Sequence, residues 1–292
     1  MVKRKISEIL VEMSISFPIV TITGPRQSGK TTLAKMTFPN KNYVSLEDLD
    51  TRQFAENDPR GFLAKYPKGA ILDEIQHVPS LLSYIQTIVD SKQMNGMFIL
   101  TGSNQFEYVQ SISQSLAGRT GMLKLLPFSY NEIYHGQEST ENILFNGFYP
   151  RIFDQKIKPE LFLSAYLETY VERDVRSLIK LKDLLQFHRF LQLCAGRTGQ
   201  IINFSNIGND LGITHNTIRN WISILEASYI IYLLPPYHQN FNKRIIKSPK
   251  LYFVDTGLAA HLLGIENSNQ LITHPLRGEL FETFVVGEFL KY

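Results

Sequence analysis

Residues 24–31 read GPRQSGKT, and this stretch decides the fold of the chain. It fits the pattern G-x-x-x-x-G-K-[ST] at every fixed position. An apolar, β-branched run, Ile19–Thr23, precedes it, and a helical pattern begins with Thr31–Met36. A strand, a glycine-containing loop and a helix in this order form the context in which such a loop binds phosphate.

The chemistry of a phosphate group explains each fixed position of this loop. Gly24 and Gly29 let backbone N–H groups point toward the anion, and the following helix aims the positive end of its dipole there. Lys30 supplies an ammonium group to the β- and γ-phosphates, and Thr31 supplies a hydroxyl to Mg²⁺. The alternative is a chance glycine turn before a helix. The predicted nucleotide-binding residues are Gly24, Pro25, Arg26, Gln27, Ser28, Gly29, Lys30, Thr31 and Thr32.

Further apolar runs alternate with helical patterns in the first half of the chain. They are Tyr43–Leu46, Gly69–Leu72 and Met97–Thr101, and apolar residues recur at helical spacing over 81–89. This alternation predicts an α/β fold, the parallel sheet of a P-loop NTPase with helices on both faces. In such folds the functional groups gather at the carboxyl ends of the strands.

Two acids end one of these runs, in the sequence AILDE at 70–74. An acid at the end of a second strand is needed to hold Mg²⁺, so Asp73 is the predicted magnesium carboxylate. Glu74 is predicted to orient and polarise the attacking water, which makes it a candidate catalytic residue together with Lys30. The plainer interpretation is a strand that ends in two solvated acids.

A polar segment follows the strand that is expected to lie between these two. Residues 98–104 read FILTGSN. Thr101, Ser103 or Asn104 is expected to sense the γ-phosphate or to help place the water. The spacing does not choose among the three, and an ordinary exit from a strand into a turn is the alternative.

Arg119 is a further catalytic candidate, in the sequence SLAGRT at 115–120. An arginine that reaches the γ-phosphate of a neighbouring subunit stabilises the charge of the transition state. From the spacing alone, an ordinary surface arginine is the favoured interpretation.

Composition limits the class of protein further. The 292 residues are 43% hydrophobic and 20% charged, which suits about two domains with sizeable cores. The single cysteine, Cys194, excludes an internal disulfide and a multi-cysteine zinc site, so a cytoplasmic location is expected. The chain contains no run of about 18 apolar residues, which argues against a membrane protein.

The excess of positive charge lies in the second half of the chain. Residues 1–155 hold 15 basic and 15 acidic residues, and residues 156–292 hold 15 and 12, which gives the net charge of +3. This distribution is a mild indication of an anionic partner for the second half.

Residues 203–234 have the pattern of a winged helix-turn-helix. Ser205 is expected to cap a short helix, Gly212 to make the turn, and Thr214 to cap a second helix. The outward side of that second helix carries residue types that read bases and phosphates, namely His215, Asn216, Arg219 and Asn220. A basic wing would add phosphate contacts through Lys243, Arg244 and Lys247. Many winged helices serve only as spacers between proteins, so double-stranded DNA and a protein both remain open as partners.

Several phrases in this order resemble the AAA-type P-loop ATPases of a prokaryotic group and the module that follows them in bacteria and archaea. The ATPase phrases are GPRQSGKT, AILDE, LTGSN and SLAGR; the second module has RDVRSLIKLKD, SILEASYIIYLLPPYHQN and HPLRGELFETFVVGEF. The resemblance covers almost the whole chain. It implies that 24–31 is the Walker A loop, that Asp73 and Glu74 are the Walker B pair and that 101–104 hold sensor 1. Arg119 lies in the LAGR phrase of the family, so the resemblance favours it as a candidate arginine finger.

The same resemblance implies a C-terminal continuation similar to PD-(D/E)xK nucleases. Glu282 and Glu288 would lie on the first helix of that fold. The sequence stops at Tyr292, before the strands that carry the other nuclease residues. We therefore expect 255–292 to be the start of a truncated segment without nuclease activity.

These observations predict both an organisation and a function. We expect an AAA-type ATPase domain at 1–135, a linker at 136–160, a helical and winged-helix domain at 161–254 and the truncated segment at 255–292. The predicted reaction is Mg²⁺-dependent hydrolysis of ATP, in a chain that can form homo-oligomers and has no membrane partner. The alternatives are an ATP-gated DNA-binding regulator with little turnover and an inactive protein–protein adaptor.

Overall fold

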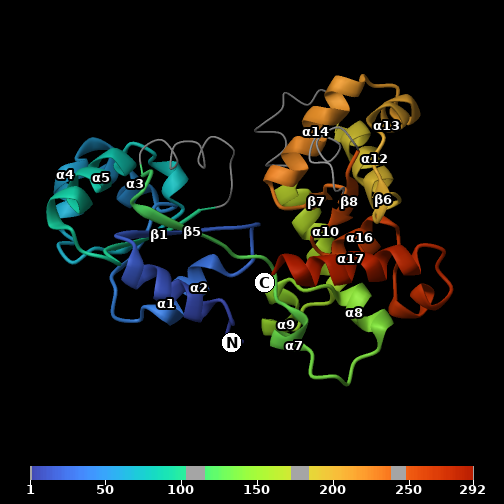
Figure 1. The fold of residues 1–292 in the computed structure, drawn as a ribbon, viewed down its shortest axis with the longest axis horizontal. Coiled ribbons are helices and arrows are strands. Elements are labelled where there is room, and N and C mark those ends of the chain that lie inside the picture. The colour runs from blue at the N-terminus through green and yellow to red at the C-terminus, as the bar shows by residue number, and fades with distance from the viewer. Residues whose placement is uncertain (1, 103–115, 172–183, 238–247, 292) are drawn as a thin grey trace. The chain divides into compact units, whose positions relative to one another are not determined.

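The computed structural model describes residues 2–102, 116–171, 184–237 and 248–291. The chain divides into two units, Met1–Leu126 and Pro127–Tyr292 (Figure 1). The described apolar residues form two buried clusters in the first unit and one in the second. Several predicted site residues lie outside the described residues, namely Ser103, Asn104, Lys243, Arg244 and Lys247.

A five-stranded parallel sheet forms the centre of the first unit. Its strands are β1 (Ile19–Thr23), β2 (Tyr43–Ser45), β3 (Ile71–Asp73), β4 (Phe98–Thr101) and β5 (Thr120–Lys124). They lie in the order β2-β3-β4-β1-β5, and each paired neighbour is parallel. β4 therefore lies between β1 and β3, as the sequence predicts. All of β1 is buried, which explains why it reads as a continuous apolar run.

Helices cover both faces of this sheet (Figure 1). One core contains Leu10 and Leu33 from the helices of one face, and another contains Phe62 and Ile85 from the helices of the other. The predicted architecture of a P-loop NTPase is confirmed. The helices of the first unit are α1 (Ser7–Ser16), α2 (Lys30–Thr37), α3 (Leu49–Asn57), α4 (Pro59–Ala64), the 3-10 helix η1 (Ile75–His77) and α5 (Leu81–Lys92).

The second unit is mainly helical. The helices that precede its first strand in the chain are α7 (Tyr130–Ile133), α8 (Thr140–Asn146), α9 (Pro150–Asp154), α10 (Pro159–Tyr166), the π-helix η2 (Leu167–Val171) and α12 (Leu184–Ala195). The later helices are α13 (Phe204–Leu211), α14 (His215–Ala227), α16 (Thr256–Leu262), the 3-10 helix η3 (Ser268–Ile272) and α17 (Arg277–Leu290). Three short antiparallel strands pair in the order β6-β8-β7, namely β6 (Gln200–Ile201), β7 (Ile231–Leu234) and β8 (Lys250–Phe253).

Helices α13 and α14 are joined by a tight turn. Asn203 caps α13, because its side chain accepts the N–H of Ser205 at 3.0 Å. The prediction of Ser205 as the cap is wrong, since the helix begins one residue before it. Gly212 makes the turn in the left-handed conformation, at φ +67°. Thr214 caps α14 by accepting the N–H of Thr217 at 3.2 Å, as predicted.

Aromatic rings fix α14 against α12. Trp221 is 4% exposed, and its ring centroid lies 5.3 Å from that of Phe187 and 5.1 Å from that of Phe190. Cys194, also on α12, is fully buried, and burial raises the pKa of its thiol well above the usual range. These four side chains stabilise the core of the second unit.

The segments expected to be a linker and a separate truncated piece both belong to this core. Residues 136–160 hold α8, α9 and the start of α10, and Tyr149 among them is fully buried. Residues 255–291 form helices and contribute Leu258 and Leu280 to the same core. In the described ranges, no helix combines the length and the apolar character that crossing a membrane requires.

Candidate nucleotide-binding site

The loop between β1 and α2 depends on glycine at two positions. Gly24 has a φ of +147°, and a Cβ there would lie 2.0 Å from the carbonyl oxygen of Leu125. Gly29 has a φ of +92° and occupies the N-cap of α2. Any other residue would clash at the first position and would be strained at the second. The sequence therefore needs both glycines to turn from the strand into the helix.

The side chains of this loop are arranged in a way that suits the binding of an anion. Lys30 is 6% exposed, and its ammonium donates to the carbonyls of Gly24 and Pro25 at 3.1 and 2.8 Å. The hydroxyl of Ser28 is buried and has no hydrogen-bond partner among the described residues. A cation and an unpaired hydroxyl in a loop before a helix N-terminus suit a phosphate. Among the remaining predicted residues, Pro25 is buried, Arg26 and Gln27 are half-buried, and Thr32 is exposed.

A carboxylate with three hydroxyl donors lies beside the loop. Asp73 is the last residue of β3 and is 6% exposed. Thr31 donates to its two oxygens at 2.9 and 3.0 Å, Tyr43 donates to Oδ2 at 2.8 Å, and Thr101 donates to Oδ1. Asp73 and Thr101 end neighbouring parallel strands at the same edge of the sheet. Tyr43 begins β2, which pairs with β3, and its long side chain reaches Asp73 from there. The structure thus brings together Thr31, Asp73 and Thr101, which are three of the predicted site residues, and adds Tyr43.

Tyr43 could have been found from strand alternation combined with strand order. Ser45 lies directly beside Asp73 in the pairing of β2 with β3, and Tyr43 shares the face of Ser45. Burial and the hydrogen bond to Asp73 raise the pKa of Tyr43 to about 12, so the phenol stays protonated and donates. The sequence did not indicate that β2 and β3 are neighbours, and for that reason it missed this residue.

Arg4 is a second residue that the sequence analysis missed. Its guanidinium donates to the carbonyl of Ser28 at 3.0 Å and to that of Leu126 at 2.8 Å. The first carbonyl belongs to the phosphate loop and the second to the last residue of the first unit. No spacing pattern links residues so far apart, so only the fold brings them together.

Glu74 has an unusual backbone conformation. It follows Asp73 directly and lies in the left-handed region, with φ +56° and ψ +46°. Such a conformation is unfavourable for a residue with a side chain and is often found at functional sites. The half-buried carboxylate accepts a hydrogen bond from the amide of Gln76. Gln76 therefore orients the carboxylate that is expected to activate water.

The donor set beside the loop fits Mg²⁺. The ion prefers carboxylate and hydroxyl oxygens, and those of Thr31 and Asp73 lie within 3.0 Å of each other. The hydroxyl groups of Thr31, Tyr43 and Thr101 already surround the Asp73 carboxylate with oxygen atoms. The described ranges hold no cluster of three or more His, Cys, Asp or Glu suited to a metal. A metal here would depend on Thr31, Asp73 and a bound phosphate.

Arg119 lies at the other end of the sheet from the phosphate loop. Thr120 pairs with Ile19, the first residue of β1, whereas the loop follows the last residue of that strand. The guanidinium donates to the carboxylate of Asp90 at 2.6 and 2.9 Å and holds the pKa of Asp90 below its usual value. The structure therefore keeps Arg119 away from the loop of its own chain.

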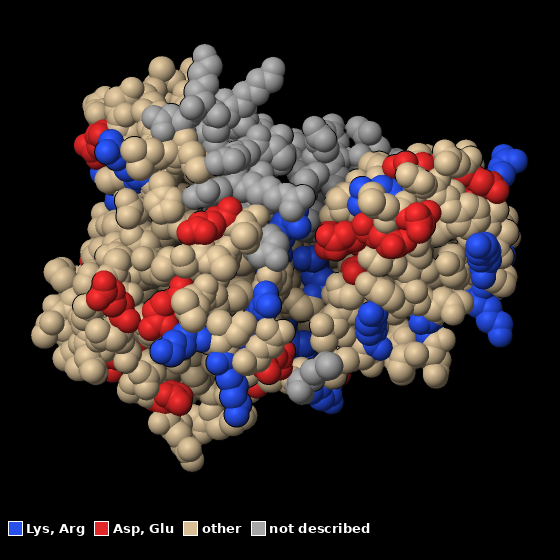
Figure 2. Space-filling model, turned by 180° about the vertical axis from the view of Figure 1, so that it is seen from behind, with Lys and Arg blue, Asp and Glu red and all other residues tan. Residues whose placement is uncertain are grey.

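The outward side of α14 is the second predicted site. His215, Asn216 and Arg219 are all exposed there. The ring of His215 lies 5.6 Å from that of Phe204 on α13, and the guanidinium of Arg219 lies 6.0 Å from the same ring. Basic and acidic side chains both occur across the face of the molecule in Figure 2. The exposed face of α14 is therefore polar, and its geometry does not identify a binding partner.

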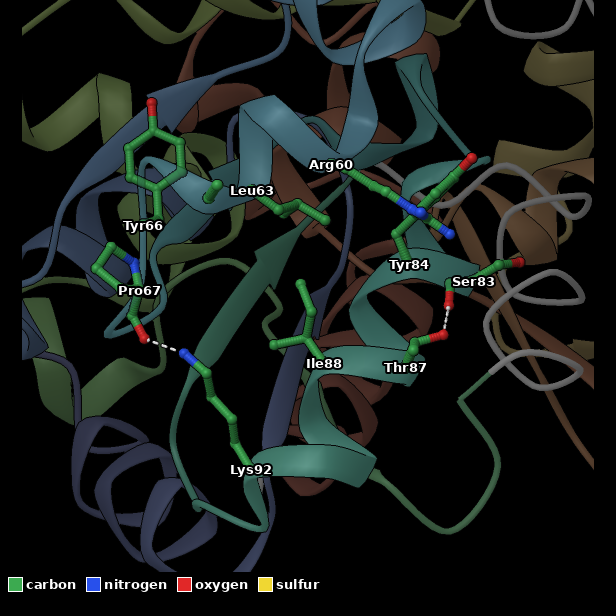
Figure 3. Close-up of a pocket in the computed structure, with 10 residues that line it drawn as sticks. Arg60, Leu63, Tyr66, Pro67, Ser83, Tyr84, Thr87, Ile88 and Lys92 are labelled. Carbon is green, nitrogen blue, oxygen red and sulfur yellow. Dashed lines mark hydrogen bonds between the residues drawn. The ribbon is translucent and has the colours of Figure 1, made fainter.

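A separate pocket of about 540 Å³ lies between α4 and α5 (Figure 3). Lys92, at one side, donates to the carbonyl of Pro67 at 2.6 Å, and Arg60 lies at the other side. Apolar and aromatic side chains form most of the rest, namely Leu63, Ala64, Tyr66, Tyr84 and Ile88. None of the residues that line it belongs to the phosphate loop or contacts Asp73. The pocket is therefore not part of the candidate nucleotide site.

The fold and the loop together define a class of protein. The first unit has the parallel sheet and glycine loop of a P-loop NTPase, and a family described as an AAA domain matches residues 16–134, which is less than half of the chain. A family described as a domain of unknown function, DUF8612, matches residues 137–269. The chain is similar to a Walker-type ATPase of Pyrococcus abyssi, with 14% identity, a TM-score of 0.56, and coverage of 90% of this chain and 96% of that one. At this identity the likeness concerns the fold.

Relatives found by sequence match most of the length of this chain. An uncharacterized protein of Mycobacterium tuberculosis is 28% identical over 276 residues, which is 93% of this chain and 62% of that protein. An uncharacterized protein of Haemophilus influenzae is 23% identical over 284 residues, which is 86% of this chain and 70% of that protein. The chain thus spans 62% of the length of its mycobacterial relative.

Proposed function

We propose that the first unit binds ATP with Mg²⁺ at residues 24–31 and hydrolyses it by attack of water on the γ-phosphate. The observation that carries this proposal is the contact of Thr31 with Asp73, at 2.9 and 3.0 Å, beside the buried ammonium of Lys30. A hydroxyl, a carboxylate and an ammonium group at this edge of a parallel sheet suit phosphoryl transfer. The match of residues 16–134 to the AAA domain family supports the same function.

Each residue then has a distinct task. The backbone N–H groups of the loop and Lys30 bind the phosphates, while Thr31 and Asp73 hold the metal. At this position Mg²⁺ would supply positive charge beside the phosphate oxygens. Glu74 orients and polarises the water, and Thr101 ties β4 to the metal carboxylate. The preference for adenine rests on the resemblance to AAA-type ATPases.

Steady-state ATP hydrolysis tests this function. Lys30→Ala removes the phosphate contact and is expected to weaken nucleotide binding. Glu74→Gln keeps the shape of the site, so it is expected to bind ATP and to lose at least about 100-fold in turnover. Glu56→Gln on α3 changes an exposed acid and serves as the matched control. Tight binding without turnover in the wild type would instead leave a nucleotide-gated regulator.

A catalytic role for Arg119 requires a second copy of the chain. The residue lies at the end of the sheet opposite its own loop, so it would complete the site of a neighbour in a homo-oligomer. A mixture of Arg119→Ala and Glu74→Gln chains tests this, because a mixed assembly contains sites with Glu74 from one chain and Arg119 from the other. Recovery of turnover in the mixture, and in neither variant alone, supports the role; its absence contradicts it.

We propose double-stranded DNA as a partner of the second unit. Helices α13 and α14 and the sheet β6-β8-β7 form an arrangement that suits a winged helix, and α14 exposes His215, Asn216 and Arg219. We include the wing residues Lys243, Arg244 and Lys247 in this proposal on the basis of the sequence alone. A rise of ATP turnover on addition of DNA would indicate that the two units are functionally coupled.

Fluorescence anisotropy of a labelled duplex, at graded salt and with and without ATP, tests the DNA proposal. Arg219→Ala is expected to weaken binding by about tenfold. Arg151→Ala, which removes an exposed arginine from α9, is the matched control and is expected to leave binding unchanged. A wild type that binds no duplex would contradict the DNA proposal and favour the alternative of a protein–protein adaptor.

A further inference from the structure

Tyr43 is placed on the site face of β2 by the alternation of the strand. In the parallel pairing, Tyr43 lies beside Ile71, and Ser45 lies beside Asp73. Residues two apart in a strand point to the same face. Ile71 belongs to the core that contains Leu33 of α2. Tyr43 and Asp73 therefore both face the helix that follows the phosphate loop.

Two contacts hold the Tyr43 side chain in one place. The ammonium of Lys35 on α2 lies 3.4 Å from the centroid of the ring, a close cation–π contact. The hydroxyl donates to Oδ2 of Asp73 at 2.8 Å. The ring is thus held by α2 and the hydroxyl by β3, although 37% of the residue is exposed.

The three hydroxyl donors of Asp73 differ in what they would do when a metal binds. Thr31 donates to both oxygens, and its hydroxyl is the one that would turn toward the ion. Thr101 then remains on Oδ1, and Tyr43 remains on Oδ2. A carboxylate held at both oxygens cannot rotate about its Cβ–Cγ bond, whereas one held at a single oxygen can.

We propose that Tyr43 is a positioning residue for metal binding, whose hydroxyl fixes the plane of the Asp73 carboxylate so that its free lone pairs face the ion. This inference rests on the proposed function, because it needs Mg²⁺ beside Thr31 and Asp73. It assigns a task to β2, the strand that pairs with β3. Tyr43 acts through Asp73 and need not contact the nucleotide.

The test is the Mg²⁺ dependence of nucleotide binding by the whole chain. Tyr43→Phe keeps the ring and its contact with Lys35 and removes only the hydroxyl. Tyr84→Phe, on α5 and away from Asp73, is the matched control. A fluorescent ATP analogue is titrated into wild type and both variants, first with EDTA and then at graded Mg²⁺. Thermal unfolding without nucleotide checks that the variants fold.

A positioning role predicts a split between the two titrations. Tyr43→Phe should bind the analogue in EDTA within about twofold of the wild type, because the hydroxyl does not contact the phosphates. Its midpoint for Mg²⁺ should rise about tenfold, as expected for a lost hydrogen bond to a charged group. Tyr84→Phe should match the wild type in both titrations.

Other outcomes overturn the inference in recognisable ways. An unchanged Mg²⁺ midpoint in Tyr43→Phe, with a Mg²⁺-dependent wild type, overturns the role of Tyr43 alone. An equal loss of binding in EDTA and in Mg²⁺ indicates that Tyr43 only stabilises the loop, which also overturns it. A wild type whose nucleotide binding ignores Mg²⁺ overturns the proposed metal site together with this inference.

Discussion

Asp73 in the first unit and Asp255 in the second are both buried aspartates near the end of an apolar strand, yet their surroundings differ. Asp73 accepts hydrogen bonds from three side-chain hydroxyls. Asp255 accepts the backbone N–H groups of Phe148 at 2.7 Å and of Leu258 at 2.9 Å. The first carboxylate is held by groups that can turn away, and the second by groups that cannot.

This difference is the one expected between the proposed metal-binding acid, Asp73, and a structural acid, Asp255. A hydroxyl rotates to a new partner without moving the backbone, so Asp73 can exchange a donor for a cation. A backbone N–H is fixed by the fold, so the two donors of Asp255 keep their partner while the unit is folded. Asp255 is 1% exposed and caps α16, and its loss would leave buried donors unpaired.

Replacement of Asp73 is expected to give the largest effect in this comparison. Asp73→Asn keeps the shape of the side chain but removes the charge that holds the metal, so Mg²⁺-dependent turnover should fall at least about 1000-fold, or 4 kcal/mol in transition-state stabilisation. The urea midpoint followed by Trp221 fluorescence, which reports on the second unit, should not change. Asp50→Asn on α3 is the exposed control. Turnover above a tenth of the wild-type rate would contradict Asp73 as a metal ligand.

Replacement of Asp255 should act on stability instead. Asp255→Ala leaves the N–H groups of Phe148 and Leu258 buried without acceptors, which should lower the free energy of unfolding of the second unit by about 3 kcal/mol. Urea unfolding monitored by the single tryptophan, Trp221, measures this. Asp210→Ala breaks only a half-exposed salt bridge with Arg197, so it should change stability by less than about 1 kcal/mol. If Asp255→Ala and Asp210→Ala lowered the free energy of unfolding equally, Asp255 would not be the structural acid that this comparison with Asp73 requires.

The smallest expected effect is a change in pH dependence. Burial raises the pKa of Asp255 above its usual value of 3.8. In the window from 3.8 up to the raised value, the folded state binds more protons than the unfolded chain. This residue therefore makes the unfolding free energy fall as the pH rises through that window.

The substitution Asp255→Asn isolates this contribution, because an amide does not titrate. Urea unfolding of wild type and Asp255→Asn from pH 4 to 7, followed by Trp221, should show a steeper fall of stability with rising pH in the wild type across the window. Parallel curves would mean that the pKa of Asp255 is the same in the folded and unfolded chain.

The sequence predicts the first unit closely because its signals are local. The loop residues 24–31, the strand before them and the acids at 73 and 74 are contiguous or end a strand, so pattern and chemistry agree at each point. β4 was also expected between β1 and β3, and the pairing confirms it. Such predictions need only the rule that functional groups gather at the carboxyl ends of parallel strands.

The contacts that the sequence missed depend on which elements are neighbours. Tyr43 reaches Asp73 only because β2 pairs with β3, and Arg4 reaches Ser28 across 24 residues of chain. Asn203 replaced Ser205 as the cap because a helix start is uncertain by a residue or two in a sequence pattern. The segment 136–160 reads as a linker, yet its buried Tyr149 places it in the core.

The sequence by itself determined the glycine loop between a strand and a helix, the parallel sheet and the position of two acids at the end of a strand, because glycine geometry and hydrophobic periodicity are properties of short stretches. Only the tertiary structure decided that Asp73 is held by Thr31, Tyr43 and Thr101 together, and that Arg119 faces away from its own loop. Those facts follow from strand order and register, which place residues from distant parts of the chain at one edge of a sheet.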